Sequence, residues 1–406
     1  MKRTLPPAGH RILLRSIFRA ATKRTDASRF LKKMNMNVPT VFLSSGTAAL
    51  TFSLSALKKK YAKKEVVLPA YSCPSVLAAV VKAGLVPVLC DLRPGCFQMD
   101  PDHLSSHLGP ATLAVIAVHL FGLPENVSVI KRIAEGKGVF LVENAAQAFG
   151  NRFPIECQPP EWRNRPDPDI PLGTVGDIGI FSFGRGKPFT LLTGGAVAIN
   201  NPELRRTLED GYKCLPVGGQ TGFLKYLLNL FIYSIFFRPS LFSIPQGIPA
   251  LKLGETIFSL DFMVERMSPA ALRLGSDLFE YFLDIRKRRL ALTAEYIACL
   301  KEFREEFYYF PDFLGEEIVL LRFPLVLHDS AKKIRILRDL KEAGMGATGM
   351  YPVSLDQQDG IRAYLNYQET FPAGGIVAGG MLTLPLHEFV EPGDVELVYR
   401  VFKRNT

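Results

Sequence analysis

Several features that define other protein classes are missing from this 406-residue sequence. It has no internal repeat and no low-complexity tract, and it has no apolar run of the ~20 residues that a membrane-spanning helix needs. The N-terminal segment is too short and too charged for a secretory signal. The cysteines show neither paired metal-binding spacing nor a short-loop disulfide framework, which favours a reduced, cytoplasmic setting. The six are Cys73, Cys90, Cys96, Cys157, Cys214 and Cys299.

The composition is that of an ordinary globular protein, with 48% hydrophobic and 22% charged residues. A chain of this length can bury a large core and is expected to form one large domain and a smaller one. Its formal net charge of +10 suits an anionic partner, either anionic lipid or an acidic substrate such as a nucleotide diphosphate sugar. The lysines between 58 and 64 are interpreted as the solvated end of a helix, because no aromatic residues alternate with them as in a nucleic-acid site.

Strand and helix patterns alternate along the first half of the chain, which predicts a mainly parallel sheet covered by helices. Strands are expected at 66–68, 86–90 and 114–118, and helices at 76–83 and 127–135. An amphipathic helix at 269–300 leads to a small α+β layer. That layer is expected to contain a strand at 317–327, a helix at 330–343 and a strand at 347–350.

Lys187 carries the clearest chemical signal. It ends the run SFGRGK at 182–187 and is followed by TGGA at 193–196. Glycines and small hydroxyl residues around an amine are what pyridoxal 5'-phosphate (PLP) chemistry needs, because the amine must lose its proton and bond an aldehyde near a phosphate anchor. A single lysine is usually a solvated surface charge, so neighbouring motifs must supply the evidence.

Two further segments point to the same chemistry. An apolar strand at 39–44 breaks at Ser45-Gly46-Thr47 into a helix. The free N–H groups and positive dipole end of such a helix suit a phosphate, although Ser and Thr also cap ordinary helices. A second apolar strand begins at 139 and ends in polar side chains at 143–147, and ligands of open α/β sheets collect at strand carboxyl ends.

Taken in order, these motifs resemble the DegT/DnrJ/StrS family of PLP-dependent sugar aminotransferases. The resemblance covers roughly residues 35–200 and resumes at 266–271 and 384–386. The ordered set is far more specific than any one of its parts. Its segments are Ser45–Leu50, Leu68–Ser72, Pro87–Asp91, His119–Gly122, Glu143–Gln147, Gly176–Gly179 and Ser182–Lys187.

The resemblance implies a fold-type I PLP-dependent transferase, similar to aspartate aminotransferase, with a mainly parallel seven-stranded sheet in a large domain and a smaller C-terminal α+β domain. It also implies a homodimer whose two subunits line each active site. Lys187 would bond PLP and carry protons. The other implied cofactor contacts are Gly46, Thr47, Ala48 and Ser182 around the phosphate, Cys73 and Asn144 near the ring, and Gln147 on the ring face.

Three positions depart from the family pattern. Asn144 replaces the usual Asp, whose carboxylate keeps the pyridine nitrogen protonated and so makes the ring a strong electron sink. A neutral amide can hydrogen-bond that nitrogen but cannot stabilise its charge. Glu143 is not expected to substitute, because successive strand side chains point to opposite faces. Cys73 stands where many members have an aromatic ring, and Val264 stands where the partner subunit usually offers Asn.

An apolar insert interrupts the family pattern. Residues 223–237 are nearly all apolar, and three interpretations stay open: a core or dimer helix, an in-plane membrane-surface helix, or a lid over the substrate. The membrane interpretation gains from Arg11, Arg15 and Arg19, which share one helical face. The expected division of the chain is a basic segment at 1–34, a PLP-binding domain at 35–265 with the insert near 220–258, and a small domain at 266–406.

The leading hypothesis is an enzyme that transfers an amino group, with glutamate as donor, to a keto group of a nucleotide-linked sugar in cell-surface polysaccharide biosynthesis. The competing hypothesis is a catalytically weakened PLP-fold protein that acts as a membrane-associated scaffold or regulator of polysaccharide assembly. Asn144, Val264 and the apolar insert motivate this second hypothesis.

The expected partners are a nucleotide-sugar substrate, an amino-acid donor and a second copy of the chain, with no nucleic acid. The expected location is the cytoplasm, with contact to the inner face of the membrane as an open alternative. No metal is expected, since His103 and His107 have the i, i+4 spacing of a helical pair but no third ligand is in view.

Overall fold

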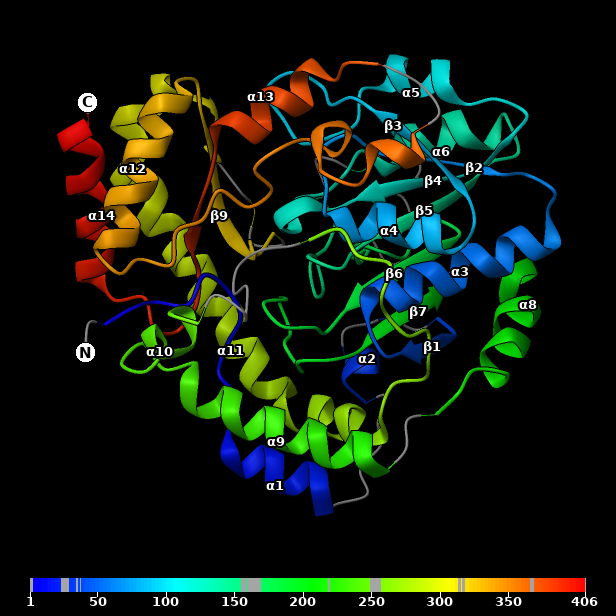
Figure 1. The fold of residues 1–406 in the computed structure, drawn as a ribbon, viewed down its shortest axis with the longest axis horizontal. Helices are drawn as coiled ribbons and strands as arrows, with labels where there is room; N and C mark the ends of the chain where they lie inside the picture. Colours follow the sequence, from blue (N-terminus) through cyan, green and yellow to red (C-terminus); the bar gives the residue numbers. More distant parts are fainter. Residues whose placement is uncertain are drawn as a thin grey trace.

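The structure is a computed structural model, drawn in Figure 1. It describes residues 3–22, 29–33, 36, 38–154, 158, 169–217, 220–248, 257–312, 315, 318–365 and 369–405. Parts of two predicted segments lie outside these residues: 1–2, 23–28 and 34 of the N-terminal segment and 249–256 of the insert. Cys157 and Glu317 also lie outside them.

A seven-stranded sheet of order β1-β7-β6-β5-β4-β2-β3 is the centre of the larger part of the molecule (Figure 1). The five strands from β3 to β6 pair in parallel, and β7 is antiparallel to β6 and to the edge strand β1. The predicted α/β fold with a mainly parallel seven-stranded sheet is therefore confirmed. The strands are β1 Thr40–Leu43, β2 Glu65–Pro69, β3 Val86–Cys90, β4 Thr112–Val118, β5 Phe140–Asn144, β6 Ile178–Ser182 and β7 Gly195–Ile199.

Helices cover both faces of this sheet, so its central strands are apolar at nearly every position. All residues of β4, β6 and β7 are buried. One large apolar cluster includes the inner sides of α3, α4 and α8, and another includes α1, α6, α9 and α11. The helices are α1 Leu14–Thr22, α2 Arg29–Lys33, α3 Gly46–Lys60, α4 Pro74–Lys82, α5 Pro101–His107, α6 Val127–Glu135, α8 Pro202–Lys213, α9 Gln220–Phe236, α10 Ser243–Gln246, α11 Pro269–Leu300, α12 Ser330–Glu342, α13 Pro372–Gly380 and α14 Pro392–Asn405.

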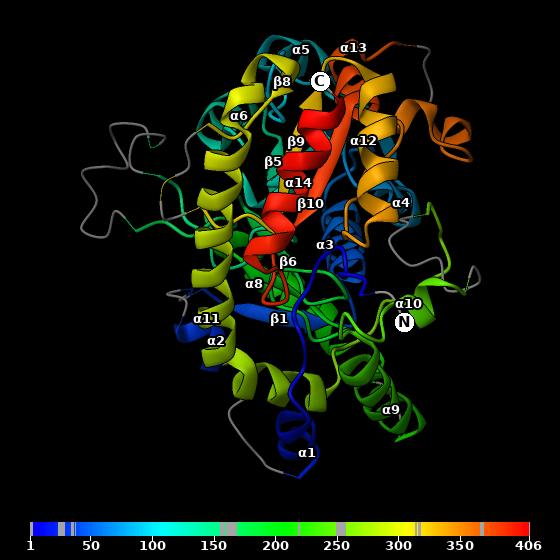
Figure 2. The same ribbon diagram turned by 90° about the vertical axis from the view of Figure 1, so that its left-hand side faces the viewer.

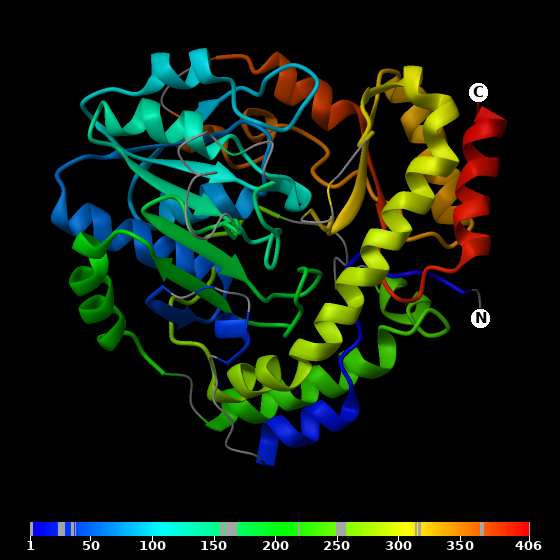
Figure 3. The ribbon, with the colours of Figure 1, turned by 180° about the vertical axis from the view of Figure 1, so that it is seen from behind.

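A second, antiparallel sheet of order β10-β9-β8 lies beside the large one, with α11, α12 and α14 on its outer side (Figure 3). Its strands are β8 Phe307–Tyr309, β9 Arg322–Leu327 and β10 Met381–Pro385. This confirms a small α+β layer near the C-terminus.

Two predicted strands of this layer are wrong in detail. The strand expected from 317 begins only at Arg322, because the N–H of Leu321 bonds to Phe121 of the large part instead of joining the ladder. The strand expected at 347–350 is reduced to a single bridge between Thr348 and Thr383. Met350 has a φ of 52°, a left-handed conformation that ends extended backbone.

The predicted helix at 269–300 is present as α11, which runs almost the full height of the molecule (Figure 2). The N-terminal segment crosses from α14 toward α9. Arg3 pairs with Asp394, and the N–H groups of Thr4 and Leu5 bond to Pro239 and Gly344. The division of the chain into domains remains a prediction.

The apolar run at 223–237 forms most of α9, which lies beside α1 (Figure 1). Its inner face belongs to the core, where Tyr233 OH donates to the carbonyl of His10 (3.1 Å) and Ser234 Oγ to that of Ile12 (2.9 Å). Its outer face is exposed, with Leu224 at 67%. Among the described helices, none has both the length and the apolar character needed to cross a membrane. The core interpretation is confirmed for the inner face only.

Candidate active site

The carboxyl ends of β5 and β6 border a cavity of about 560 Å³. Every predicted site residue except Ala48 lines it. Ala48 is buried in α3, where its N–H donates to the Ser45 Oγ cap (3.0 Å). The lining residues are Gly46, Thr47, Leu50, Cys73, Ser75, Val76, Val118, Asn144, Ala146, Gln147, Ser182 and Lys187.

The start of α3 faces this cavity with its positive end. Ser45 and the following turn occupy the N–H groups of Ala48 and Ala49, but no hydrogen bond joins the N–H of Thr47 to another described residue. Gly46 is required by close packing, since an added Cβ would lie 2.6 Å from the Cβ of Ser182. A helix start with a free N–H beside a hydroxyl side chain has the donors that a phosphate accepts.

Lys187 follows the turn Gly184–Gly186, where Gly186 has a φ of +70°. Thr190 Oγ1 donates to the carbonyls of Gly184 and Lys187 and so fixes this turn. Burial lowers the pKa of the Lys187 amine; Cys73 opposes the shift and the positive charge of Arg322 adds to it. A lowered pKa leaves more of the amine unprotonated, which is the nucleophilic form.

The orientation of the Asn144 amide follows from its hydrogen bond. Oδ1 accepts the backbone N–H of Ala146 (3.1 Å), and a backbone N–H cannot donate to an NH₂ group. The NH₂ therefore remains, and it makes no hydrogen bond with a described residue. Because it is a donor, it suits an unprotonated ring nitrogen rather than a protonated one.

Glu143 is not a replacement for the missing carboxylate, as the sequence predicted. Its buried side chain accepts hydrogen bonds from the backbone N–H groups of Gly173, Val175 and Gly176 and contacts His119 Nε2 at 3.0 Å. Burial alone would raise the pKa of Glu143, but these hydrogen bonds hold it below its ordinary value. The carboxylate is fully used on the other face of β5.

Two residues from the C-terminal part of the chain complete the surroundings of the cavity. Gln147 Oε1 accepts the N–H of Phe121 (2.9 Å), and its Nε2 donates to the hydroxyl of Tyr351 (3.2 Å). The rings of Tyr351 and Tyr71 lie 5.7 Å apart. The second residue is Arg322, close enough to Lys187 to lower the pKa of its amine. We call Arg322 and Tyr351 the C-terminal pair.

The sequence analysis missed the C-terminal pair. One signal was present for Arg322, which is the only charged residue in the apolar run IVLLRFPLVL at 318–327. A lone arginine on a strand that is otherwise fully apolar must be buried, and a buried charge demands a partner. Tyr351 had no comparable signal.

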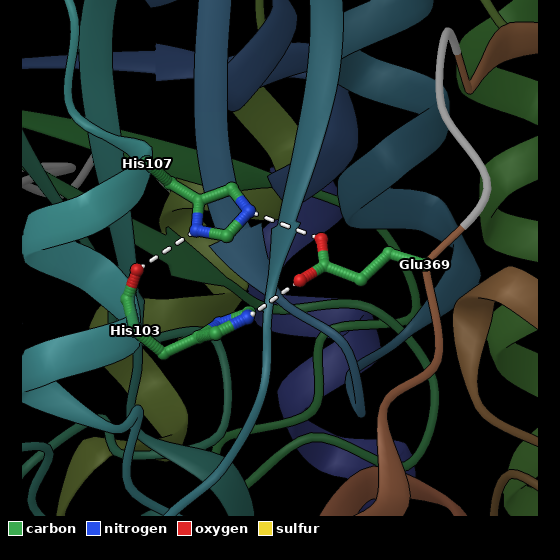
Figure 4. Close-up of side chains that lie close together, drawn as sticks. All are labelled: His103, His107 and Glu369. Atoms are coloured by element: carbon green, nitrogen blue, oxygen red, sulfur yellow. Dashed lines mark hydrogen bonds and ion pairs between the residues drawn. The ribbon is translucent and has the colours of Figure 1, made fainter.

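A separate cluster involves the predicted histidine pair of α5. Glu369, a third group that the sequence did not reveal, contacts both rings: Oε1 lies 2.9 Å from His103 Nε2, and Oε2 lies 3.1 Å from His107 Nε2 (Figure 4). We call these three residues the histidine clasp. The three groups lie within metal-binding reach of one another, so their hydrogen bonds must decide between a metal and a proton.

These hydrogen bonds disfavour a metal. His103 Nδ1 accepts the N–H of Asp91 (3.0 Å), so the neutral ring carries its proton on Nε2 and has no lone pair there for a metal. His107 Nδ1 faces the carbonyl of His103 at 2.8 Å and must be protonated, so the contact of its Nε2 with Glu369 needs a second proton (Figure 4). The geometry is that of an imidazolium paired with a carboxylate.

Comparison with known proteins identifies the family. The profile of the DegT/DnrJ/EryC1/StrS aminotransferase family matches residues 28–227 and 259–403. The chain belongs to this family. Its aminotransferases are PLP-dependent, and the predicted resemblance is confirmed.

Two curated relatives resemble part of the chain. The L-glutamine:2-deoxy-scyllo-inosose aminotransferase of Streptomyces kanamyceticus is 34% identical over 166 residues, which are 41% of this chain and 35% of that protein. The GDP-perosamine synthase of Escherichia coli O157:H7 is 30% identical over 178 residues, 44% of this chain and 43% of that protein. The chain thus spans well under half the length of each relative.

Solved structures of the DegT/DnrJ/EryC1/StrS family share the whole fold. The putative sugar aminotransferase Spr1654 from Streptococcus pneumoniae, in its PMP form, has a TM-score of 0.74, with 98% of both chains covered at 18% identity. Helicobacter pylori PseC, an aminotransferase of pseudoaminic acid biosynthesis, has a TM-score of 0.73 over 98% of both chains at 15% identity. At these identities the likeness establishes the fold alone.

The residues around the cavity fit the cofactor of the DegT/DnrJ/EryC1/StrS family. Thr47 and Ser182 offer donors for a phosphate, and Gly46 leaves the space that a Cβ would fill. Lys187 offers a buried amine, and Asn144 a free NH₂. The fit is complete except for charge, since no carboxylate of a described residue lines the cavity to stabilise a protonated ring nitrogen.

Proposed function

We propose that this chain is a PLP-dependent aminotransferase that moves an amino group from an amino acid to a keto group of a nucleotide-linked sugar, as a step of cell-surface polysaccharide biosynthesis. The donor's amino group is exchanged for the acceptor's keto oxygen, so no external oxidant or reductant is needed. The observation that carries the proposal is the buried amine of Lys187 in the same cavity as the start of α3.

The proposal gives each residue a physical task. When bound, PLP supplies an electron-withdrawing ring that allows the donor's amino-bearing carbon to lose its proton. Lys187 Nζ takes that proton and returns it, because its lowered pKa suits both directions of transfer. Thr47 and Ser182 hold the phosphate, Asn144 orients the ring nitrogen, and Gln147 is held by Phe121 and Tyr351 where it can cover the ring.

The direct test is the visible spectrum of purified protein incubated with PLP. We expect an absorbance band from bound cofactor that changes when L-glutamate is added without an acceptor. A spectrum that never changes with any amino acid would reject the aminotransferase proposal.

The donor and acceptor can be compared with what relatives are named for. Glutamate is the proposed donor, while the names of several relatives give L-glutamine as theirs, so both should be tested in parallel. The named products and substrates of relatives include a GDP-linked sugar and a free keto cyclitol. Turnover of nucleotide-linked keto sugars but not of the cyclitol is the proposed outcome.

We further propose a cytoplasmic homodimer that touches the inner face of the membrane. Support for the membrane contact is the outer surface of α1 and α9, where Phe18 is 70% exposed and Leu224 67%, next to exposed Arg15 and Lys225. This surface combines apolar and basic groups as anionic membranes require. Sedimentation would measure the dimer, and flotation with anionic vesicles would measure membrane contact.

The same surface favours a second candidate function, a membrane-associated scaffold or regulator of polysaccharide assembly. Two measurements separate it from the enzyme. A scaffold floats with anionic vesicles but shows no spectral change with PLP and glutamate. Phe18→Glu should abolish flotation in either case, whereas Ile334→Glu, at an exposed apolar position of α12, should not.

A further inference from the structure

Arg322 is the least satisfied charged group near the cavity. It is 8% exposed, at the start of β9, and the only hydrogen bond of its side chain to a described residue runs from Nη1 to Thr348 Oγ1 (2.8 Å). Nε is buried without any partner, and no carboxylate of a described residue pairs with the guanidinium. An isolated buried charge costs several kcal/mol (about 3–5 in measured cases) unless an anion compensates it.

The charge of Arg322 is retained at neutral pH. Burial lowers the pKa of Arg322 to about 10, with Tyr351 acting in the opposite direction, so the group is still a cation. Two cations, Lys187 and Arg322, therefore lie near one another with no anion from the described residues between them. Such an arrangement is stable only when a ligand supplies the negative charge.

The free edge of the guanidinium defines the shape of that ligand. Thr348 occupies Nη1 and is itself bonded to Thr383 Oγ1 (2.9 Å), so it holds Arg322 in one orientation. The opposite edge presents Nε–H and Nη2–H side by side, and neither has a partner among the described residues. Two parallel N–H groups match the two oxygens of a carboxylate.

We propose that Arg322 binds the α-carboxylate of the amino-acid donor through Nε and Nη2. The proposal rests on the aminotransferase function proposed above. The α-carboxylate is attached to the same carbon as the reacting amine, so a cation near Lys187 is in reach of it. A phosphate would be a second anionic source, and the experiment must distinguish the two.

The test compares wild type with Arg322→Gln and Arg322→Lys, using L-glutamate, its α-amide and its γ-amide in half-reactions without acceptor. In wild type, the α-amide should react far more weakly than glutamate or the γ-amide. In Arg322→Gln, half-saturation by glutamate should rise about 100-fold, and the preference over the α-amide should disappear. Arg322→Lys should recover part of it. Arg338→Gln, at an exposed arginine of α12, is the matched control and should behave as wild type.

A second readout needs no turnover. Because the charge of Arg322 lowers the pKa of Lys187, Arg322→Gln should shift PLP uptake by the apoprotein to higher pH. A variant that merely misfolds would lose uptake at every pH, and Arg322→Lys would then carry the comparison.

The outcomes separate the two proposals. If wild type does not react with any amino acid, the proposed function fails. If wild type reacts and Arg322→Gln keeps both its glutamate saturation and its preference over the α-amide, the Arg322 site is overturned. A loss confined to PLP affinity, or to saturation by the nucleotide-linked acceptor, would assign Arg322 to a phosphate and likewise overturn it.

Discussion

The cavity draws its residues from two regions that differ in construction. The large sheet supplies Gly46, Thr47, Asn144, Ser182 and Lys187, each in a short turn at the end of a strand or the start of a helix, with backbone groups determining its position. The C-terminal pair comes from β9 and a loop, and it reaches the cavity through long side chains. Backbone-built positions suit a cofactor that stays bound, whereas side chains with unused donors suit a substrate that comes and goes.

This difference explains why the two regions tolerate different changes. A substitution in the sheet region alters backbone packing or the reacting groups and should affect the cofactor. A substitution in the C-terminal pair should affect substrate recognition while the cofactor remains bound. The variants below test that separation, beginning with the largest expected effect.

Lys187→Ala removes the reacting amine from the sheet region. We expect a loss of at least about 10⁴-fold in turnover, because both the covalent anchor and the proton carrier disappear. The cofactor absorbance band should also be lost, as measured after gel filtration. Retention of full turnover would place the chemistry on another residue and end the comparison.

Gly46→Ala tests the close packing between α3 and β6. The added Cβ would lie 2.6 Å from Ser182, so we expect a loss of about 1–3 kcal/mol in the free energy of unfolding and weaker PLP binding. Denaturant unfolding and PLP titration measure both. Gly393→Ala, where nothing lies within 4 Å, is the control.

Asn144→Asp restores the charge that the sheet region lacks. The introduced carboxylate can still accept the Ala146 N–H with one oxygen and present the other to the ring nitrogen. A charge-assisted contact would make the half-reaction about tenfold faster, with glutamate saturation unchanged. The ¹⁵N shift of labelled PLP should report a protonated ring nitrogen only in the variant. An unchanged shift would contradict the assigned orientation of the Asn144 amide.

His107→Ala tests how far the C-terminal pair depends on its surroundings. Glu369 precedes α13, whose first N–H groups donate to Asp91, so the histidine clasp helps to hold this segment on the large sheet. Since the clasp is partly exposed, we expect a loss of only about 0.5–1 kcal/mol in the free energy of unfolding. Added Zn²⁺ should not stabilise wild type more than the variant, and a selective rise in melting temperature would instead indicate a metal site.

Most of the sheet region could be predicted from the sequence, because strands that are buried on both faces are continuous apolar runs and the polar groups at their ends are conspicuous. The histidine clasp and the C-terminal pair could not, since Glu369, Arg322 and Tyr351 come from segments far from their partners in the chain. The failed strand at 347–350 has the same origin, because the left-handed backbone of Met350 is not evident from local propensity. The exposed outer face of α9 was also ambiguous, since apolar core and surface helices have similar compositions.

One measurement tests the central claim most directly. Protein incubated with PLP, reduced with borohydride and digested should yield a single PLP-modified peptide with the added mass on Lys187. Modification of another lysine, or of none, would contradict the assignment of this cavity as the cofactor site.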